Sequence, residues 1–271
     1  MAGTGHDADP IDTTKPHSAR MYDYYLDGKD HYEVDQEAAA QVLAVFPSIK
    51  ICARTNRQFM HRATRWITAH TDVRQFLDVG TGIPTQPNLH QIAQETHPES
   101  RVVYVDYDPV VLRHAQALMR SKPEGRTAYI QADVREPETI TSAELLHQTL
   151  DLSRPVALSL NALLHFVPDE RRPYEIVQHL VDALAPGSYL MMSHCTPDFD
   201  PEAWEKILDV YRAGGIEIQV RSRKEVLGFF DGLEFVEPGL EVPHRWQPDG
   251  ETLSGATDAA VSLYAGVARK R

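Results

Sequence analysis

Cysteine is scarce in this sequence. Only two cysteines, Cys52 and Cys195, occur among its 271 residues, and they lie far apart in the chain. A disulfide framework or a cysteine-based zinc site requires more thiols at short spacings, so the sequence indicates neither. No other cluster of ligand residues indicates a metal, and we expect both cysteines to be buried free thiols.

Long apolar runs are also missing. A membrane helix needs about 20 consecutive, mostly apolar residues, and no stretch of this sequence comes near that length. The polar stretch at residues 1–16 contains no apolar segment like that of a secretory signal. We therefore expect a cytoplasmic protein without a membrane partner, beginning with a disordered tail at residues 1–16.

Positive charge is in deficit. Lysine and arginine together number 27 against 39 aspartates and glutamates, which gives a formal net charge of -12. Affinity for nucleic acid comes largely from neutralising phosphates, so this balance disfavours a nucleic-acid partner. Small-molecule substrates fit better, with protein substrates as the alternative.

The pattern of apolar residues along the chain changes near residue 73. Residues 17–72 are helical in pattern, with helices expected at 18–26, 34–46 and 48–69. From 73 to 271, short runs rich in β-branched residues alternate with helical stretches, which predicts an α/β fold with a mostly parallel sheet in one domain. We place the strands at 75–79, 101–106, 128–131, 156–160, 189–193, 234–236 and 262–268. The last two are expected to form an antiparallel hairpin with a long connection at 238–257.

Two glycines follow the first strand, in Asp78-Val79-Gly80-Thr81-Gly82. Glycine allows a sharp turn from strand to helix and a close approach of the backbone to a ligand. A tight turn needs glycine for structural reasons as well, so this motif alone leaves both interpretations open.

Acidic residues end the next two strands. Asp106 closes the second strand, where a carboxylate in a nucleotide-binding unit accepts hydrogen bonds from ribose hydroxyls. Asp133 follows the third strand, where it could accept the amine of adenine. Capping is the alternative for Asp106 and turn formation is the alternative for Asp133. Because open α/β sheets bind ligands at the carboxyl ends of their strands, these positions together predict one adenosyl-binding site.

These motifs resemble those of the class I S-adenosylmethionine-dependent methyltransferases, which also share the segment Leu184-Ala185-Pro186-Gly187 before the fifth strand. The resemblance implies a Rossmann-like, mostly parallel seven-stranded sheet with a C-terminal antiparallel hairpin, and S-adenosylmethionine as cofactor. The glycine loop would border the methionine part of the cofactor, Asp106 would hold the ribose, and Asp133 with Val134 would read the adenine. The full set of cofactor-binding residues expected on this basis is Asp78, Gly80, Thr81, Gly82, Asp106, Tyr107, Asp133, Val134 and Asn161.

A closer resemblance links the chain to the actinobacterial S-adenosyl methyltransferase family, whose substrate is unassigned. It rests on residues 19–30, 56–59, 82–88 and 264–267, and covers nearly the whole chain. One departure from the general methyltransferase loop is Pro84, which stands in place of the third glycine and removes an N–H.

Candidate residues for the methyl acceptor lie after the fourth strand and in the N-terminal helices. Asn161 and His165 are the catalytic candidates, with His165 as general base or substrate orienter, although it could equally be a structural histidine. Tyr22 and Tyr25 share a helix face, which favours core packing, or they belong to a lid over the sulfonium. Arg57 could reach the methionine carboxylate or lie on a solvated basic face.

Two other functions compete with a methyltransferase. A NAD-dependent oxidoreductase begins with the same kind of βαβ unit. Its GxGxxG motif, however, requires a final glycine where this chain has Thr85. A non-catalytic S-adenosylmethionine-binding regulator is the second alternative, because methyltransferases have no universal catalytic side chain. Asn161 is not followed by a Pro-Pro-aromatic run, which further disfavours methylation of nucleic-acid bases.

Overall fold

The computed structural model of the chain describes residues 12–118 and 120–271. Most of the predicted N-terminal tail, residues 1–11, lies outside the described residues. Just after it, the guanidinium of Arg20 donates hydrogen bonds to the carbonyl oxygens of Asp12 (3.2 Å) and Lys15 (3.1 Å). Residues 12–15 are therefore held against the first helix.

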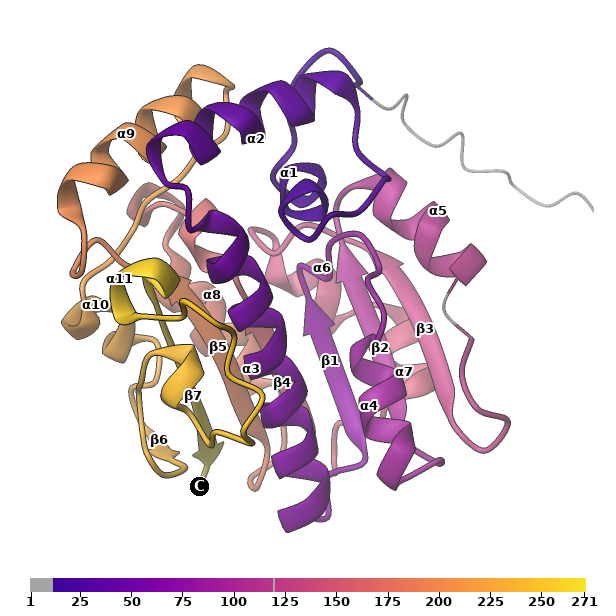
Figure 1. Cartoon of the computed structure of the whole chain (residues 1–271). Helices are drawn as coiled ribbons and strands as arrows, with labels where there is room; N and C mark the ends of the chain where they lie inside the picture. The colour runs from indigo at the N-terminus through magenta and orange to yellow at the C-terminus, as the bar shows by residue number, and fades with distance from the viewer. Residues whose placement is uncertain (1–11, 119) are drawn as a thin grey trace, which may run out of the picture.

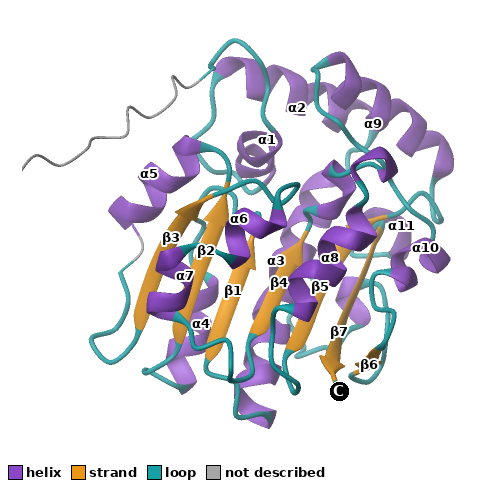
Figure 2. Cartoon of the chain, turned by 180° about the vertical axis from the view of Figure 1, so that it is seen from behind, coloured by secondary structure: helices purple, strands orange, loops and turns teal. Residues whose placement is uncertain are grey.

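A seven-stranded sheet with the order β3-β2-β1-β4-β5-β7-β6 forms the centre of the molecule (Figure 2). Neighbouring strands pair in parallel from β3 to β5, and β7 pairs antiparallel with both β5 and β6. The predicted fold class is therefore confirmed. The strands are β1 (Gln75–Val79), β2 (Arg101–Asp106), β3 (Arg126–Gln131), β4 (Ala157–Asn161), β5 (Tyr189–Cys195), β6 (Leu233–Phe235) and β7 (Leu263–Lys270).

Helices connect the strands and cover both faces of the sheet. The α-helices of the described residues are α1 (Ser18–Tyr25), α2 (Glu33–Val45), α3 (Ile49–His70), α4 (Leu89–Thr96), α5 (Pro109–Leu118), α6 (Pro137–Thr141), α7 (Glu144–Thr149), α8 (Pro173–Asp182), α9 (Pro201–Ala213), α10 (Arg223–Gly228) and α11 (Asp258–Val261). Short 3-10 helices occupy Leu164–Phe166, Asp169–Arg171 and Pro243–Arg245. None of the helices in the described ranges combines the length and hydropathy that a bilayer crossing requires.

Side chains that alternate along the strands build a core on each face of the sheet. Phe76 and Val102 point toward α3 and α4, where they join a cluster with Phe59 and Ile67 of α3. Leu77 and its neighbours on the other face join a second cluster with side chains of α7 and α8. This alternation follows from the two-residue period of a strand. Figures 1 and 2 show α3 and α4 on one face and α7 and α8 on the other.

Helices α1, α2 and α9 lie above the carboxyl ends of the parallel strands (Figure 1). The three predicted N-terminal helices match α1, α2 and α3 within one residue at each end. The first helix stops shortly before Gly28, and the left-handed residue after it is Asp27, with φ of 60°. Gly28 is needed for another reason, because a Cβ there would lie 1.9 Å from the carboxylate of Asp23.

Asp35 fastens the start of α1 to α2. Its fully buried carboxylate accepts hydrogen bonds from the backbone N–H groups of His17 (2.8 Å) and Tyr32 (2.9 Å). The guanidinium Nε of buried Arg20 lies 3.4 Å from the same carboxylate. One acidic side chain therefore determines where the N-terminal helix rests over the sheet edge.

Candidate functional site

The loop after β1 turns sharply through two glycines. Gly80 has φ of 72° and Gly82 has φ of 66°, a left-handed conformation that costs residues with a Cβ energy. The N–H of Gly80 donates to the carbonyl of Val105 in β2 (2.8 Å), so the loop stays against the neighbouring strand. A Cβ at Gly80 would also approach the side chain of Leu163 to 2.5 Å.

Asp106, at the end of β2, holds this loop from the other side. One carboxylate oxygen accepts from the N–H of Gly82 (2.8 Å) and the other from the N–H of Asp108 (3.0 Å). Burial raises the pKa of the Asp106 carboxyl to about 6, against the hydrogen bonds from these backbone groups. Asp108 in turn caps α5, since its carboxylate accepts from the N–H of Val110 (2.8 Å).

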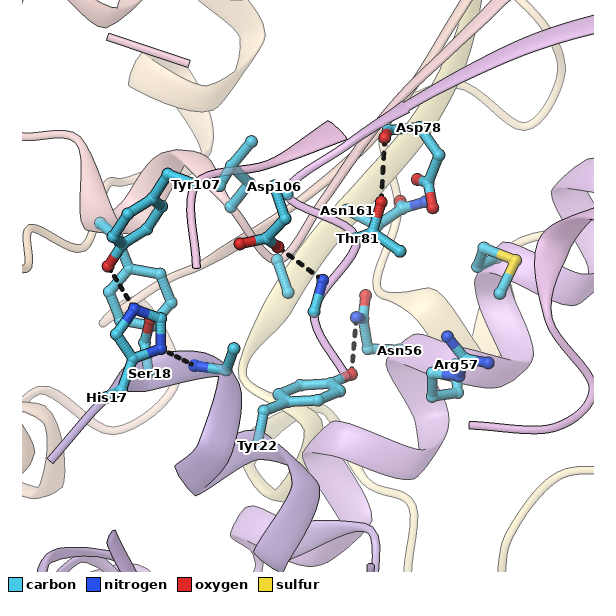
Figure 3. A pocket seen from close by; sticks show the side chains of 17 residues that line it. His17, Ser18, Tyr22, Asn56, Arg57, Asp78, Thr81, Asp106, Tyr107 and Asn161 are labelled. Carbon is cyan, nitrogen blue, oxygen red and sulfur yellow. Dashed lines mark hydrogen bonds between the residues drawn. The ribbon is translucent and has the colours of Figure 1, made fainter. Parts of the chain in front are cut away.

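A cavity opens between this loop, α1 and α3, and we call it the first cavity (Figure 3). It contains about 760 Å³ of empty space, part of which is open to solvent. Its lining residues are His17, Ser18, Ala19, Tyr22, Asn56, Arg57, Met60, Asp78, Gly80, Thr81, Gly82, Asp106, Tyr107, Asn161, Ala162, Leu163 and Phe166. Elements from both the helical N-terminus and the sheet therefore meet around it.

Opposite charges line one part of the first cavity. Burial raises the pKa of Asp78 to about 6, while a hydrogen bond from Ser159 and the charge of Arg57 act in the opposite direction. Arg57 donates to the carbonyl oxygens of Thr85 (2.5 Å) and Pro87 (2.9 Å). These bonds hold the guanidinium beside the glycine loop.

An amide group adds a free acceptor to the same cavity. Asn161 donates from Nδ2 to Ser159 Oγ (2.9 Å), whereas its buried Oδ1 has no hydrogen-bond partner among the described residues. A buried polar atom without a partner is unfavourable, so this oxygen is available to a bound donor.

The predicted site residues fall into three adjoining groups. Asp78, Gly80, Thr81, Gly82, Asp106, Tyr107, Asn161, Tyr22 and Arg57 line the first cavity. Asp133 and Val134 line a neighbouring cavity that shares His17, Ser18, Tyr107, Leu163 and Phe166 with the first. Tyr25 and His165 line neither of these but face another hollow, described below.

The carboxylate of Asp133 already forms an ion pair with Arg135. Arg135 Nε lies 3.0 and 2.9 Å from its two carboxylate oxygens. Burial raises the pKa of Asp133, but the hydrogen bonds and charge of Arg135 outweigh it and the net pKa is lowered. An adenine amine bound there would therefore share the carboxylate with Arg135.

His17 was not among the residues predicted for the site. It caps α1, and its Nδ1 accepts from the N–H of Ala19 (3.3 Å) and lies 3.3 Å from Asp108. Its Nε2 is 2.5 Å from the hydroxyl of Tyr107. Burial lowers the pKa of His17. His17 and Tyr107 line both the first cavity and the Asp133 cavity, and Figure 3 shows the hydrogen-bonded pair at one edge of the first cavity.

A second cavity lies beside the first, beneath α1 and α9. Its empty space is about 490 Å³, part of which is open to solvent. The two cavities share Ser18, Tyr22, Asn56, Ala162 and Phe166, so these side chains separate them. The remaining lining residues are Tyr25, Ile49, Cys52, Ala53, His165, Cys195, Trp204, Ile207, Tyr211, Ile218 and Leu263.

Hydrogen bonds fix the wall between the two cavities. The hydroxyl of Tyr22 donates to the carbonyl of Ala53 (3.0 Å) and accepts from Nδ2 of Asn56 (2.9 Å). Oδ1 of Asn56 accepts from Ser193 Oγ (2.5 Å). The predicted lid tyrosine is thus bonded to α3, and α3 is bonded to β5.

His165 faces the second cavity and is 4% exposed. Its Nε2 lies 3.8 Å from Cys195 Sγ, and its Nδ1 has no hydrogen-bond partner among the described residues. Burial lowers the pKa of His165 well below the usual range, and the nearby His194 and Arg221 add to the effect. His194 lies one residue beyond the strand predicted at 189–193 but within β5, and its Nε2 accepts from Arg221 Nη1 (2.9 Å).

Comparison with known proteins places the chain in a family. The family model of S-adenosyl methyltransferases matches residues 4–271. The chain is 47% identical to a DUF574 family protein from Streptomyces avermitilis, whose crystal structure has a TM-score of 0.94 with 97% of this chain and all of that one covered. A candidate methyltransferase from Thermobifida fusca is 37% identical, with a TM-score of 0.89 and coverage of 96% and 97%.

More distant structures share the fold. The plantazolicin methyltransferase BpumL, solved in complex with S-adenosylhomocysteine, is 11% identical, with a TM-score of 0.53 over 93% of this chain and 95% of that one. No curated protein matches the sequence. Because the family model spans nearly the whole sequence, the chain belongs to the S-adenosyl methyltransferase family, and it is an S-adenosylmethionine-dependent methyltransferase.

Proposed function

We propose that this enzyme transfers a methyl group from S-adenosylmethionine to a small-molecule acceptor, with the cofactor in the first cavity and the acceptor in the second. The observation that carries the proposal is the meeting of Arg57, Asp78 and Asp106 with the glycine loop around one cavity. S-adenosylmethionine carries an ammonium group, a carboxylate and a ribose, and each has a partner of suitable chemistry in this set.

The lining residues fit the cofactor part by part. Asp78 suits the ammonium of the methionine part, and Arg57 suits its carboxylate. Asp106 retains acceptor capacity for ribose hydroxyls beyond its two backbone hydrogen bonds. The glycines of the loop present backbone without side chains, and the free Oδ1 of Asn161 offers one more acceptor.

The adenine would extend past Tyr107 toward Asp133 and Val134. This path follows from the residues that the first cavity shares with the Asp133 cavity. His17 and Tyr107 stand across it, so their hydrogen bond would break or shift to admit the base.

In methyl transfer the protein mainly has to align the acceptor atom with the methyl carbon and the sulfur of the cofactor. The bound cofactor supplies a methyl group on a sulfonium, which is already activated for displacement. The second cavity would hold the acceptor against the wall formed by Tyr22, Asn56 and Phe166, and these side chains would have to part where the acceptor atom meets the methyl carbon. His165, kept neutral by burial, would orient the acceptor, whereas its lowered pKa disfavours the alternative role of general base.

Calorimetry with S-adenosylhomocysteine tests the cofactor site. We expect binding of the wild-type enzyme with a Kd on the order of micromolar and no heat with NAD. Asp106→Asn should weaken binding by about 10- to 100-fold, because a charged acceptor for the ribose is lost. Asp72→Asn, which changes an exposed acid between α3 and β1, is the matched control and should bind like the wild type.

The same titration has a pH dependence. Because the pKa of Asp106 is raised to about 6, its carboxylate gains a proton between pH 7 and pH 5 and loses acceptor capacity. The affinity for S-adenosylhomocysteine should fall over that range, and less steeply in Asp106→Asn. If Asp106→Asn and wild type bind S-adenosylhomocysteine equally well at pH 7, Asp106 does not contact the bound cofactor.

A further inference from the structure

The second cavity differs from the first in charge. The first cavity includes Arg57, Asp78 and Asp106, whereas none of the residues that line the second is aspartate, glutamate, lysine or arginine. An ion transferred into such surroundings loses its hydration without gaining a counter-charge, which is strongly unfavourable. The second cavity therefore rejects charged groups of either sign.

The titratable side chains of this cavity are neutral as well. Burial raises the pKa of Tyr22, Tyr25 and Tyr211 above the usual range of tyrosine. It also raises the pKa of both cysteines and lowers that of His165. At neutral pH the whole lining is thus without formal charge.

Two hydrogen-bonding groups in this lining have unused capacity. The hydroxyls of Tyr25 and Tyr211 lie 3.3 Å apart and bond to each other, which uses only one of their two hydrogens. Nδ1 of His165 is buried and has no partner in the described part of the chain. Polar but uncharged groups of a ligand could satisfy each of them.

The rest of the second cavity is apolar and aromatic. Phe166, Trp204, Ile207 and Leu263 contribute to its walls. Pockets lined in this way bind ligands mainly through apolar contact and use a few polar groups for orientation. The shared wall at Tyr22 and Asn56 puts the near end of such a ligand next to the first cavity.

We infer that the second cavity holds the methyl acceptor, and that this acceptor is a small, uncharged, mainly apolar molecule with a hydroxyl group, such as a phenol. The inference rests on the proposed function. In the transfer, a lone pair of the hydroxyl oxygen forms the bond to the methyl carbon, and the electrons of the carbon–sulfur bond remain on sulfur. The hydroxyl proton is released to water, since the lowered pKa of His165 disfavours an imidazolium in this uncharged lining, and a neutral ether leaves with S-adenosylhomocysteine.

Three phenols of one scaffold test the charge requirement. 4-Ethylphenol is neutral, 4-hydroxyphenylacetate is an anion and tyramine is a cation, while their rings are the same. With the enzyme saturated by S-adenosylhomocysteine, we expect 4-ethylphenol to bind at least about tenfold more tightly than either ion. The same order should appear in transfer of tritiated methyl from S-adenosylmethionine. Equal or tighter binding of an ion, or no 4-ethylphenol binding at millimolar concentration, overturns the inference.

A variant assigns the binding to this cavity. Cys52 lines the second cavity and not the first, so Cys52→Phe should fill it and abolish 4-ethylphenol binding, while the Kd for S-adenosylhomocysteine stays within about twofold of wild type. Cys52→Ala enlarges the second cavity and should bind 4-ethylphenol at least as well as wild type. Unchanged 4-ethylphenol binding in folded Cys52→Phe overturns the inference. If Cys52→Phe does not fold, the phenol series on the wild type still decides it. If the wild type does not bind S-adenosylhomocysteine at all, the proposed function is refuted instead.

Discussion

Two constraints meet at Gly80: its φ is 72°, and the side chain of Leu163 fills the space where a Cβ would stand. At Gly232 only the first applies, since φ is 78° and no heavy atom lies within 4 Å of an added Cβ. The pair therefore separates backbone strain from crowding at the proposed cofactor loop.

Gly80→Ala should lower the free energy of unfolding by about 2 to 4 kcal/mol, from strain and overpacking together. Gly232→Ala should cost about 1 to 2 kcal/mol, from strain alone. Urea denaturation measures both. Similar losses in the two variants would mean that Leu163 moves aside freely.

At the scale of single elements, Asp35 tests whether α2 holds α1 in place. Asp35→Asn removes the negative charge next to buried Arg20, and breaking a buried pair costs about 3 to 5 kcal/mol. The amide protons of the α1 region should then exchange faster, which hydrogen-exchange mass spectrometry measures. The affinity for S-adenosylhomocysteine should fall as well, because His17 and Tyr22 line the first cavity.

Asp27→Asn is the matched control for Asp35→Asn. Asp27 lies between α1 and α2 and pairs with Lys50 and Arg54, but it is exposed. Exposed pairs contribute within about 1 kcal/mol, so this variant should exchange like the wild type. Equal effects of the two substitutions would show that Asp35 has no special role in fastening α1.

The strands and the three N-terminal helices could be predicted from local pattern, except at their ends. The strand expected at 128–131 begins at Arg126, and the last strand runs on to Lys270. Both extensions carry charged residues, but they pair with neighbouring strands, Arg126 opposite Arg101 and Lys270 opposite Leu233. Pairing across the sheet depends on the partner strand, which a local pattern does not contain.

The candidate site was predictable only where it follows the strands. Asp78 and Asp106 reach one cavity because parallel strands bring their carboxyl ends to one edge. His17 could not be found in this way, because it meets Tyr107 only after the N-terminal helix folds back over that edge. The second cavity likewise requires residues from α1, α3, α9 and β7, which only the tertiary fold brings together.

For the whole molecule, buried histidines predict a loss of stability in acid. Burial lowers the pKa of His61 and His90 to about 4 and that of His194 to about 3. Between pH 6.5 and pH 4 the unfolded chain binds protons at these sites and the folded chain does not. Each histidine then destabilises the fold by up to about 1.4 kcal/mol per pH unit.

Asp78 and Asp106 act in the opposite sense, because their pKa values of about 6 let the folded state bind protons first. The histidines with lowered pKa values, which also include His17, His165 and His244, outnumber these two carboxyls. We therefore expect Tm to fall by several degrees, roughly 5 °C, from pH 7 to pH 5. Differential scanning calorimetry measures this, and His90→Gln should flatten the slope. A Tm that is constant or rises toward pH 5 would contradict the prediction.

Ser18 and Tyr22 of α1 belong to the walls of both cavities. In the proposed mechanism, any displacement of α1 that releases one product therefore also uncovers the other. Donor and acceptor would have to be present together before turnover, so plots of initial rate against one substrate at fixed levels of the other should intersect. The exit of S-adenosylhomocysteine and that of the methylated product would then be limited by the same opening of the N-terminal helix.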